Sequence, residues 1–161
     1  DIKLLESSPG DRGWDIFLLE YRIQDLSPLS TIFSTEIMNA YLKIFKFLWR
    51  LKRVEHALSS SWRMNMEHAT KFAKIKGMKH KFHTFNLAHH EMMHFVSNIH
   101  NYMMVEVLES SWKVFKDDVS KANDLDELIE VKKKFVTTIM DKALLSEKNN
   151  DMYRNLEKIL N

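Results

Sequence analysis

The sequence predicts a mainly α-helical bundle of long helices, with a small β element near the N-terminal end. Three observations lead to this fold class. The 161 residues include only 3 Gly and 2 Pro, and all of these precede Met78, whereas sheet-rich folds need both residue types at many tight turns. Apolar residues recur at helical spacing over most of the chain. Strict two-residue alternation, which is typical of a half-buried strand, occurs convincingly only in residues 14–24.

The alternating segment is the predicted strand. Its apolar positions on one side are Phe17, Leu19, Tyr21 and Ile23. A lone strand leaves its backbone N–H and C=O groups without partners, so we expect this strand to pair with a nearby segment.

Two long helices are expected to form the frame of the bundle. The first runs from Thr35 to about Trp62, with Ser34 as its N-cap, and its wide apolar surface predicts that it lies between neighbouring elements. The second runs from Phe82 to about Val119 without Gly or Pro, and at 1.5 Å per residue it would be about 50 Å long. Its predicted stripe consists of Phe85, Met92, Phe95, Ile99, Met103 and Leu108.

Two shorter helices are predicted to complete the bundle. Asp124 and Glu127 have the spacing of a capping box, which predicts the start of a third helix. A fourth helix is expected from about Asn150. Its predicted stripe consists of Met152, Leu156 and Leu160. Between the two long helices, the basic stretch 71–81 contains Gly77 and predicts a loop or a frayed helix end.

Composition argues against several classes of function. There is no Cys, which rules out disulfides, thiolate zinc sites and cysteine nucleophiles. The net charge of +2, from 24 basic and 22 acidic residues, argues against a dedicated nucleic-acid-binding protein. The longest apolar runs, such as residues 16–19, are too short to span a bilayer. No signal peptide precedes them, and the first residue is Asp1 rather than Met, so we expect a piece of a longer chain.

One motif suggests metal chemistry. Residues 90–94, His-Glu-Met-Met-His, match H-E-x-x-H, in which two His on one helical face hold Zn²⁺ and the Glu activates a bound water. His100 stands where the extended form of this motif has its third ligand. A zinc-dependent hydrolase is therefore one interpretation of this sequence, and a protein that only binds a partner is the other.

Several features weigh against a zinc site. The extended motif uses a Gly to end the helix and return the third ligand to the metal, but Ser97 stands there. In a continuous helix His100 lies roughly 240° around the axis from His94, away from the metal. We therefore expect no metal and no cofactor. Instead, His90 and His94 are expected to be partly exposed, with Met92 and Phe95 facing the core.

Two groups of basic residues are candidate docking surfaces. The first long helix carries a group that consists of Arg50, Lys52, Arg53 and His56. Glu55 lies among these residues. Such a group is usually a solvated face, but it can also dock an acidic partner, because Arg suits carboxylate recognition. The run 132–134 of three Lys is expected to be plain surface. No phosphate-binding loop or G-x-S-x-G motif occurs, so nucleotide binding by such a loop and serine hydrolase chemistry have no support.

Several segments resemble one known family. SPGDRGWDIFLLEYRI (residues 8–23) and PLSTIFSTEIMNAYLKIFKFLWRLKRVEHAL (28–58) are similar to a strand and a helix in the C-terminal part of gamma-tubulin complex components. EMMHFVSNIHNYMMVEVLESSW (91–112) and DLDELI (124–129) resemble later parts of the same family, in the same order. The similarity spans nearly the whole chain. Between Trp62 and Lys81 the sequence departs from the pattern of the family.

The resemblance implies that residues 1–161 are a fragment of the C-terminal GRIP domain, a helical bundle that holds gamma-tubulin, with a variable loop around 63–81. The implied role is that of a non-enzymatic scaffold subunit, which binds gamma-tubulin beside other complex components and helps to template microtubule nucleation. The implied location is the cytoplasm, at a microtubule-organizing centre such as a centrosome or spindle pole. Neither nucleic acid nor a membrane is an expected partner.

The motif-matching polar and aromatic positions are the expected contacts with gamma-tubulin, since Trp and Arg often anchor interfaces. They are Arg12, Trp14, Asp15, Arg50, Lys52, Arg53 and Glu55. A helical adaptor for some other acidic protein is a third interpretation, in which reversal of Arg50 and Arg53 to Glu abolishes binding while loss of the strand motif does not.

Overall fold

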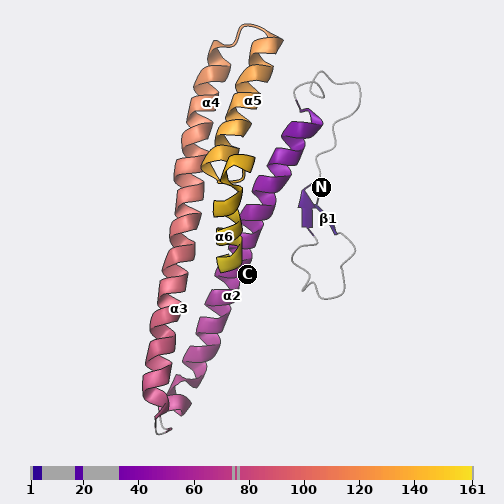
Figure 1. Cartoon of the computed structure of the whole chain (residues 1–161). Helices are drawn as coiled ribbons and strands as arrows, with labels where there is room; N and C mark the ends of the chain where they lie inside the picture. The colour runs from indigo at the N-terminus through magenta and orange to yellow at the C-terminus, as the bar shows by residue number, and fades with distance from the viewer. Residues whose placement is uncertain (1, 5–16, 20–32, 74, 76, 161) are drawn as a thin grey trace.

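The computed structural model describes residues 2–4, 17–19, 33–73, 75 and 77–160. In these residues the chain forms a bundle of long helices with a two-stranded ribbon beside it (Figure 1). The mainly α-helical class is therefore confirmed. None of the helices in the described ranges combines the length and the apolar composition that crossing a membrane requires.

The β element is an antiparallel pair. β1 (Ile2–Leu4) and β2 (Phe17–Leu19) pair so that Ile2 lies opposite Leu19 and Leu4 opposite Phe17. β2 lies inside the segment predicted as a strand, and β1 is the expected nearby partner. Tyr21 and Ile23 lie outside the described residues.

α2 (Thr35–Ala73) is the first long helix, and it begins where the sequence predicts. The Ser34 hydroxyl accepts a hydrogen bond from the Ile37 N–H at 3.4 Å, and the Ser34 carbonyl accepts one from the Met38 N–H at 3.0 Å. Ser34 is thus the N-cap. The helix packs against β2, α3, α5 and α6, so its position between neighbouring elements is also confirmed.

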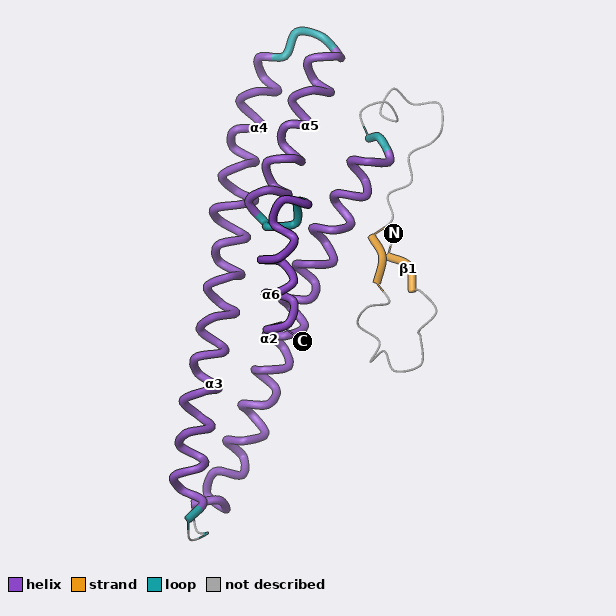
Figure 2. Tube along the Cα trace, in the orientation of Figure 1, coloured by secondary structure: helices purple, strands orange, loops and turns teal. Residues whose placement is uncertain are grey.

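The structure corrects the loop predicted around 63–81. α2 continues past Trp62 to Ala73 and α3 begins at Met78, so only residues 74–77 lie between the two helices (Figure 2). Residues 63–73 contain no Gly or Pro that would end the helix. The next helix starts after Gly77, whose φ of 84° is a left-handed conformation that Gly adopts at little cost. That the sequence of this region varies among related proteins stays a prediction.

The second long helix is continuous, as predicted, but it contains a stretch of different geometry. α3 (Met78–Asn101) leads into η1 (Tyr102–Glu109), a π-helix, and then into α4 (Ser110–Lys121). The hydrogen bonds of a π-helix run from i to i+5 and widen each turn. Residues four apart therefore stay on one face. The buried residues here have this spacing: Met103, Val107 and Ser111.

The buried stripe of this second helix differs from the prediction. His89, Val96 and Met103 are buried, with a spacing of seven residues. They pack in the manner of a coiled-coil seam toward α2, whose buried Ile44 and Leu51 are also seven residues apart and share a core cluster with Val96 and Met103. The predicted stripe is wrong at three positions, because Phe85, Met92 and Phe95 are 43%, 47% and 39% exposed. These apolar residues lie on the flank of the helix rather than along the seam.

α5 (Leu125–Lys142) folds back beside α4 (Figure 1), and its predicted cap is confirmed. The Asp124 carboxylate accepts the Glu127 N–H at 2.7 Å, and the Glu127 carboxylate accepts the Asn123 N–H at 2.8 Å. The helix ends at Lys142. Beyond it, Leu144 has a left-handed φ of 61°, and the Leu145 N–H donates to the Met140 carbonyl.

A single 3₁₀ turn, η2 (Glu147–Asn149), leads into α6 (Asn150–Leu160), which lies alongside α2 (Figure 1). Leu156 and Leu160 face the core as predicted, but Met152 is 60% exposed. Tyr153 takes its place and packs on Phe47 with a centroid separation of 6.1 Å. The described core thus joins α2, the second long helix, α5 and α6.

Candidate functional site

Arg50 joins two helices. Its guanidinium donates to the carboxylate of Glu157, which is on α6, and the two side chains are 27% and 35% exposed. The pair is partly shielded from water and holds α6 against α2. Arg50 therefore has a structural role within the bundle, and a partner would have to compete with Glu157 to bind it directly.

Lys52 and Glu55 form a second polar group on α2. The Lys52 ammonium donates to Glu55 Oε2 at 2.9 Å, and Nδ1 of His100, on α3, lies 3.5 Å from the same oxygen. The hydrogen bond from Lys52 lowers the pKa of Glu55 below its ordinary value. Partial burial opposes this shift, while the charges of Lys52 and His100 add to it. Glu55 is therefore an ionised acceptor between the two long helices.

The predicted contact residues do not all share one direction. Arg50 points to α6, and Glu55 points to α3. Arg53 is half-buried and lies about 200° around the axis from the buried Leu51, on the other side of α2. Arg12, Trp14 and Asp15 lie outside the described residues. The structure thus brings Lys52 and Glu55 into contact and separates them from Arg50 and Arg53.

The H-E-x-x-H residues do not converge. His90, Glu91 and His94 are all exposed, and His94 Nδ1 lies 3.2 Å from the Asn98 amide nitrogen. His100 faces Glu55 instead of His94. No cluster of three or more metal-ligating side chains occurs within the described ranges. The expectation that His90 and His94 are at least partly exposed helix residues is confirmed, whereas the expectation that Met92 and Phe95 face the core is wrong.

The neighbouring His89 is a residue that sequence reasoning missed. It is only 1% exposed, and its Nε2 lies 2.9 Å from the Leu58 carbonyl oxygen. A carbonyl can only accept, so this nitrogen carries the proton and donates. The ring also contacts Trp62 and Phe85 at centroid separations of 5.3 Å and 6.1 Å. The seven-residue spacing of His89, Val96 and Met103 is the signal that could have identified it.

Lys132 corrects the prediction that the run 132–134 is plain surface. Lys133 and Lys134 are exposed, but Lys132 is only 6% exposed, and its ammonium lies 2.9 Å from the centroid of the Phe33 ring. Burial lowers the pKa of Lys132 to about 8. This Lys therefore belongs to the contact between α5 and the start of α2.

Comparison with known proteins decides the family. The family model for the gamma tubulin complex component C-terminal region matches residues 1–161. The chain belongs to this family. It is 36% identical over 159 residues to the gamma-tubulin complex component 3 homolog of Xenopus laevis. The matched region covers 99% of this chain and 17% of that protein.

Other relatives give the same result. The chain is 37% identical to gamma-tubulin complex component 3 of Arabidopsis thaliana, over 96% of this chain and 19% of that protein. It is 40% identical to the spindle pole body component alp6 of Schizosaccharomyces pombe, over 95% of this chain and 19% of that protein. The chain thus spans about a fifth of the length of these curated relatives. The resemblance that the strand and helix motifs predicted is confirmed.

Proposed function

We propose that this chain is part of a scaffold subunit of a gamma-tubulin complex, which binds gamma-tubulin and helps to template microtubule nucleation. The match of the family model over residues 1–161 carries the proposal. The proposed location is the cytoskeleton at a microtubule-organizing centre, because relatives are named spindle pole body components. The other proposed partners are further components of the same complex.

The proposed mechanism is positioning, without bond-making by this chain. α2 has 39 residues, so at 1.5 Å per residue it is about 58 Å long. Such a strut, packed against α3, α5 and α6, can hold a bound protein at a fixed place and angle. Gamma-tubulins held side by side by several subunits would have a high effective concentration, which removes much of the entropy cost of assembling a nucleus.

We propose the motif residues that the family resemblance predicts as contacts: Arg12, Trp14, Asp15, Arg50, Lys52, Arg53 and Glu55. Among the described ones, Lys52 is the best candidate for direct contact. The exposed Lys52–Glu55 pair stabilises the chain by about 0.5 kcal/mol or less, so a carboxylate of the partner can replace Glu55 at little cost. Arg50 would act by holding α6 in place through Glu157.

Binding of purified gamma-tubulin to the immobilised chain tests this proposal by biolayer interferometry. The double variant Lys52→Glu and Arg53→Glu should weaken binding at least tenfold, equivalent to about 1.4 kcal/mol. The control variant Lys113→Glu and Lys121→Glu makes the same charge change at exposed positions of α4 and should stay within about twofold. Equal affinity of the two double variants would contradict the residue assignment. Failure of the folded chain to bind at all would contradict the function.

A further inference from the structure

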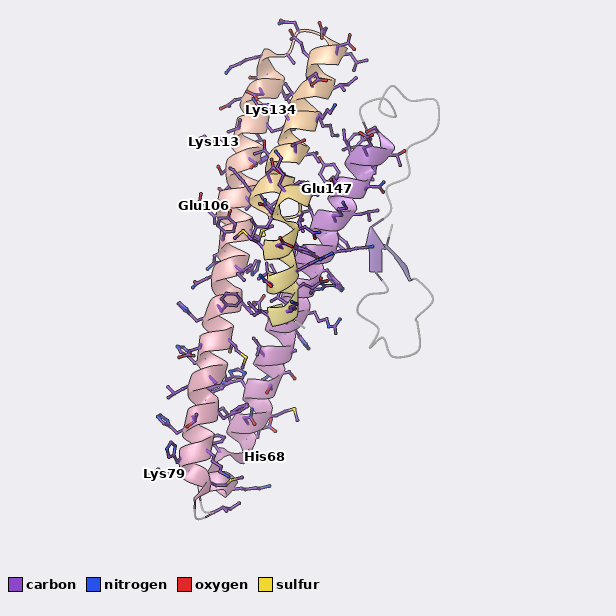
Figure 3. The ribbon with its side chains drawn as sticks, in the orientation of Figure 1. His68, Lys79, Glu106, Lys113, Lys134 and Glu147 are labelled. Carbon is purple, nitrogen blue, oxygen red and sulfur yellow. The ribbon has the colours of Figure 1, made fainter. Side chains whose placement is uncertain are left out.

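The end of the α2–α3 hairpin, defined here as the tip (residues 63–85), is strongly basic. It contains six of the 24 Lys and Arg residues and one of the 22 acidic residues, so its formal charge is +5 and that of the remaining chain is −3. His68 and Lys79, from the two helices of the hairpin, lie at this same end of the bundle (Figure 3). The near-neutral total charge therefore conceals a local positive field.

The tip also exposes large apolar side chains. The exposed fractions are 61% for Met64, 47% for Met66, 51% for Ile75, 37% for Met78 and 43% for Phe85. Single exposed apolar residues are ordinary, but exposed apolar residues that line one hollow, as Met78 and Phe85 do, indicate an interaction site. Met side chains are flexible and polarizable, and they suit surfaces that adapt to a bound apolar group.

A hollow combines the two properties. It has a volume of about 300 Å³ and is lined by Asn65 of α2 and by Met78, Lys81, Phe82 and Phe85 of α3. Its walls are therefore mostly apolar, with the exposed Lys81 at its edge. A volume at the lower limit of ligand pockets accommodates one or two side chains of a partner rather than a large cofactor.

We infer that the tip binds an acidic amphipathic helix of another protein. An apolar side chain of that helix occupies the hollow, and its carboxylates lie against Lys79 and Lys81. A helix suits this surface because its apolar anchors recur at i, i+3 and i+4 while its other positions carry charge. Opposite charges on the two surfaces steer the encounter and fix the register. A concave, apolar hollow between two helices favours a side chain over a lipid surface or a phosphate backbone.

The inference does not rest on the proposed function. Lys52 and Asn65 are separated by 13 residues of α2, which corresponds to about 20 Å along the helix axis. The tip is thus a surface apart from the proposed gamma-tubulin contacts at Lys52 and Arg53.

Selection of a phage-displayed library of short random peptides on the intact chain tests the inference. The enriched peptides should be rich in Asp and Glu, with apolar residues at helical spacing. Synthetic copies should lose at least tenfold in affinity against Lys79→Glu with Lys81→Glu, and also against Met78→Ser. They should stay within about twofold against the control Lys113→Glu with Lys121→Glu. Circular dichroism checks that each variant is folded, and the tip variants should bind gamma-tubulin as the wild type does.

Four results would overturn the inference. The first is no enrichment, and the second is enrichment of peptides that are neutral or basic. The third is equal binding of the peptides to wild type and tip variants. The fourth is that phosphatidylserine vesicles or single-stranded RNA bind more tightly than any peptide and that the tip variants lose this binding. That result would assign the surface to a membrane or to nucleic acid. Loss of gamma-tubulin binding in the tip variants would contradict the separation of the two surfaces.

Discussion

Replacement of His89 by Ala separates a structural histidine from the exposed histidines of the H-E-x-x-H motif. His89 is 1% exposed and is held by the Leu58 carbonyl at 2.9 Å and by the rings of Trp62 and Phe85. His90, the next residue, is exposed on the outer surface of the same helix. The two positions therefore form a matched pair for one substitution.

The expected loss in the free energy of unfolding is about 3 kcal/mol for His89→Ala. The lost hydrogen bond contributes about 1 kcal/mol, and the two ring contacts contribute about 0.5 kcal/mol each at the lower limit. The cavity left by the imidazole adds about 1 kcal/mol. For a chain of this length, each kcal/mol lowers Tm by about 2–4 °C, so Tm should fall by roughly 6–12 °C.

Thermal and urea unfolding, followed by far-UV circular dichroism, measure both variants. His90→Ala should change the free energy of unfolding by less than about 0.5 kcal/mol, as surface substitutions usually do. The reasoning is refuted if His90→Ala destabilises the chain as much as His89→Ala does. It is also refuted if His89→Ala leaves Tm unchanged.

Three further predictions concern stability and metal binding. Because burial lowers the pKa of Lys132 to about 8 from 10.5, the unfolded chain binds more protons between these values, so stability should rise as pH increases from 8 to 10.5. In urea titrations, Lys132→Met should remove this pH dependence. It should also raise the free energy of unfolding at neutral pH by about 1 kcal/mol, since Met has no charge to desolvate. A pH dependence that persists in this variant would contradict its assignment to Lys132. Asp124→Ala should cost about 1 kcal/mol by removing the N-cap of α5, measured by the same titration, and an unchanged midpoint would argue against the cap. Elemental analysis of untagged protein should find no stoichiometric zinc, and His90→Ala with His94→Ala should leave the metal content unchanged; bound zinc that this variant loses would restore the metal interpretation.

Much of the fold could be predicted because local signals and packing agree. The Ser34 and Asp124 caps use side chains that accept backbone N–H groups at the ends of their own helices, so a few residues suffice to recognise them. The end of α2 was harder, because residues 63–73 contain no Gly or Pro to mark a helix end and have no clear helical stripe. Asn65 of this segment lines a hollow together with residues of α3, so packing between the two helices supports the continuation.

The seam of the second long helix could not be read from hydrophobicity alone. Phe85, Met92 and Phe95 are more apolar than His89, yet they lie on an exposed flank. A polar residue with one satisfied hydrogen bond inside an apolar seam has no distinctive sequence signal beyond its spacing. The π-helix η1, which shifts the seam from seven-residue to four-residue steps, was equally invisible.

The candidate contacts were predicted from motif resemblance, which carries no geometry. The resemblance groups Arg50 with Lys52 as contacts, but in the structure Arg50 forms an ion pair with Glu157 of α6. Such a contact, between residues far apart in the chain, depends on how α6 folds back. The local sequence around Arg50 does not contain that information.

Analytical ultracentrifugation of this chain mixed with purified gamma-tubulin measures whether the two proteins form a complex. We expect a complex of one chain with one gamma-tubulin, formed without added zinc or other cofactor. Two separate species, observed with a chain that circular dichroism shows to be folded, would contradict it.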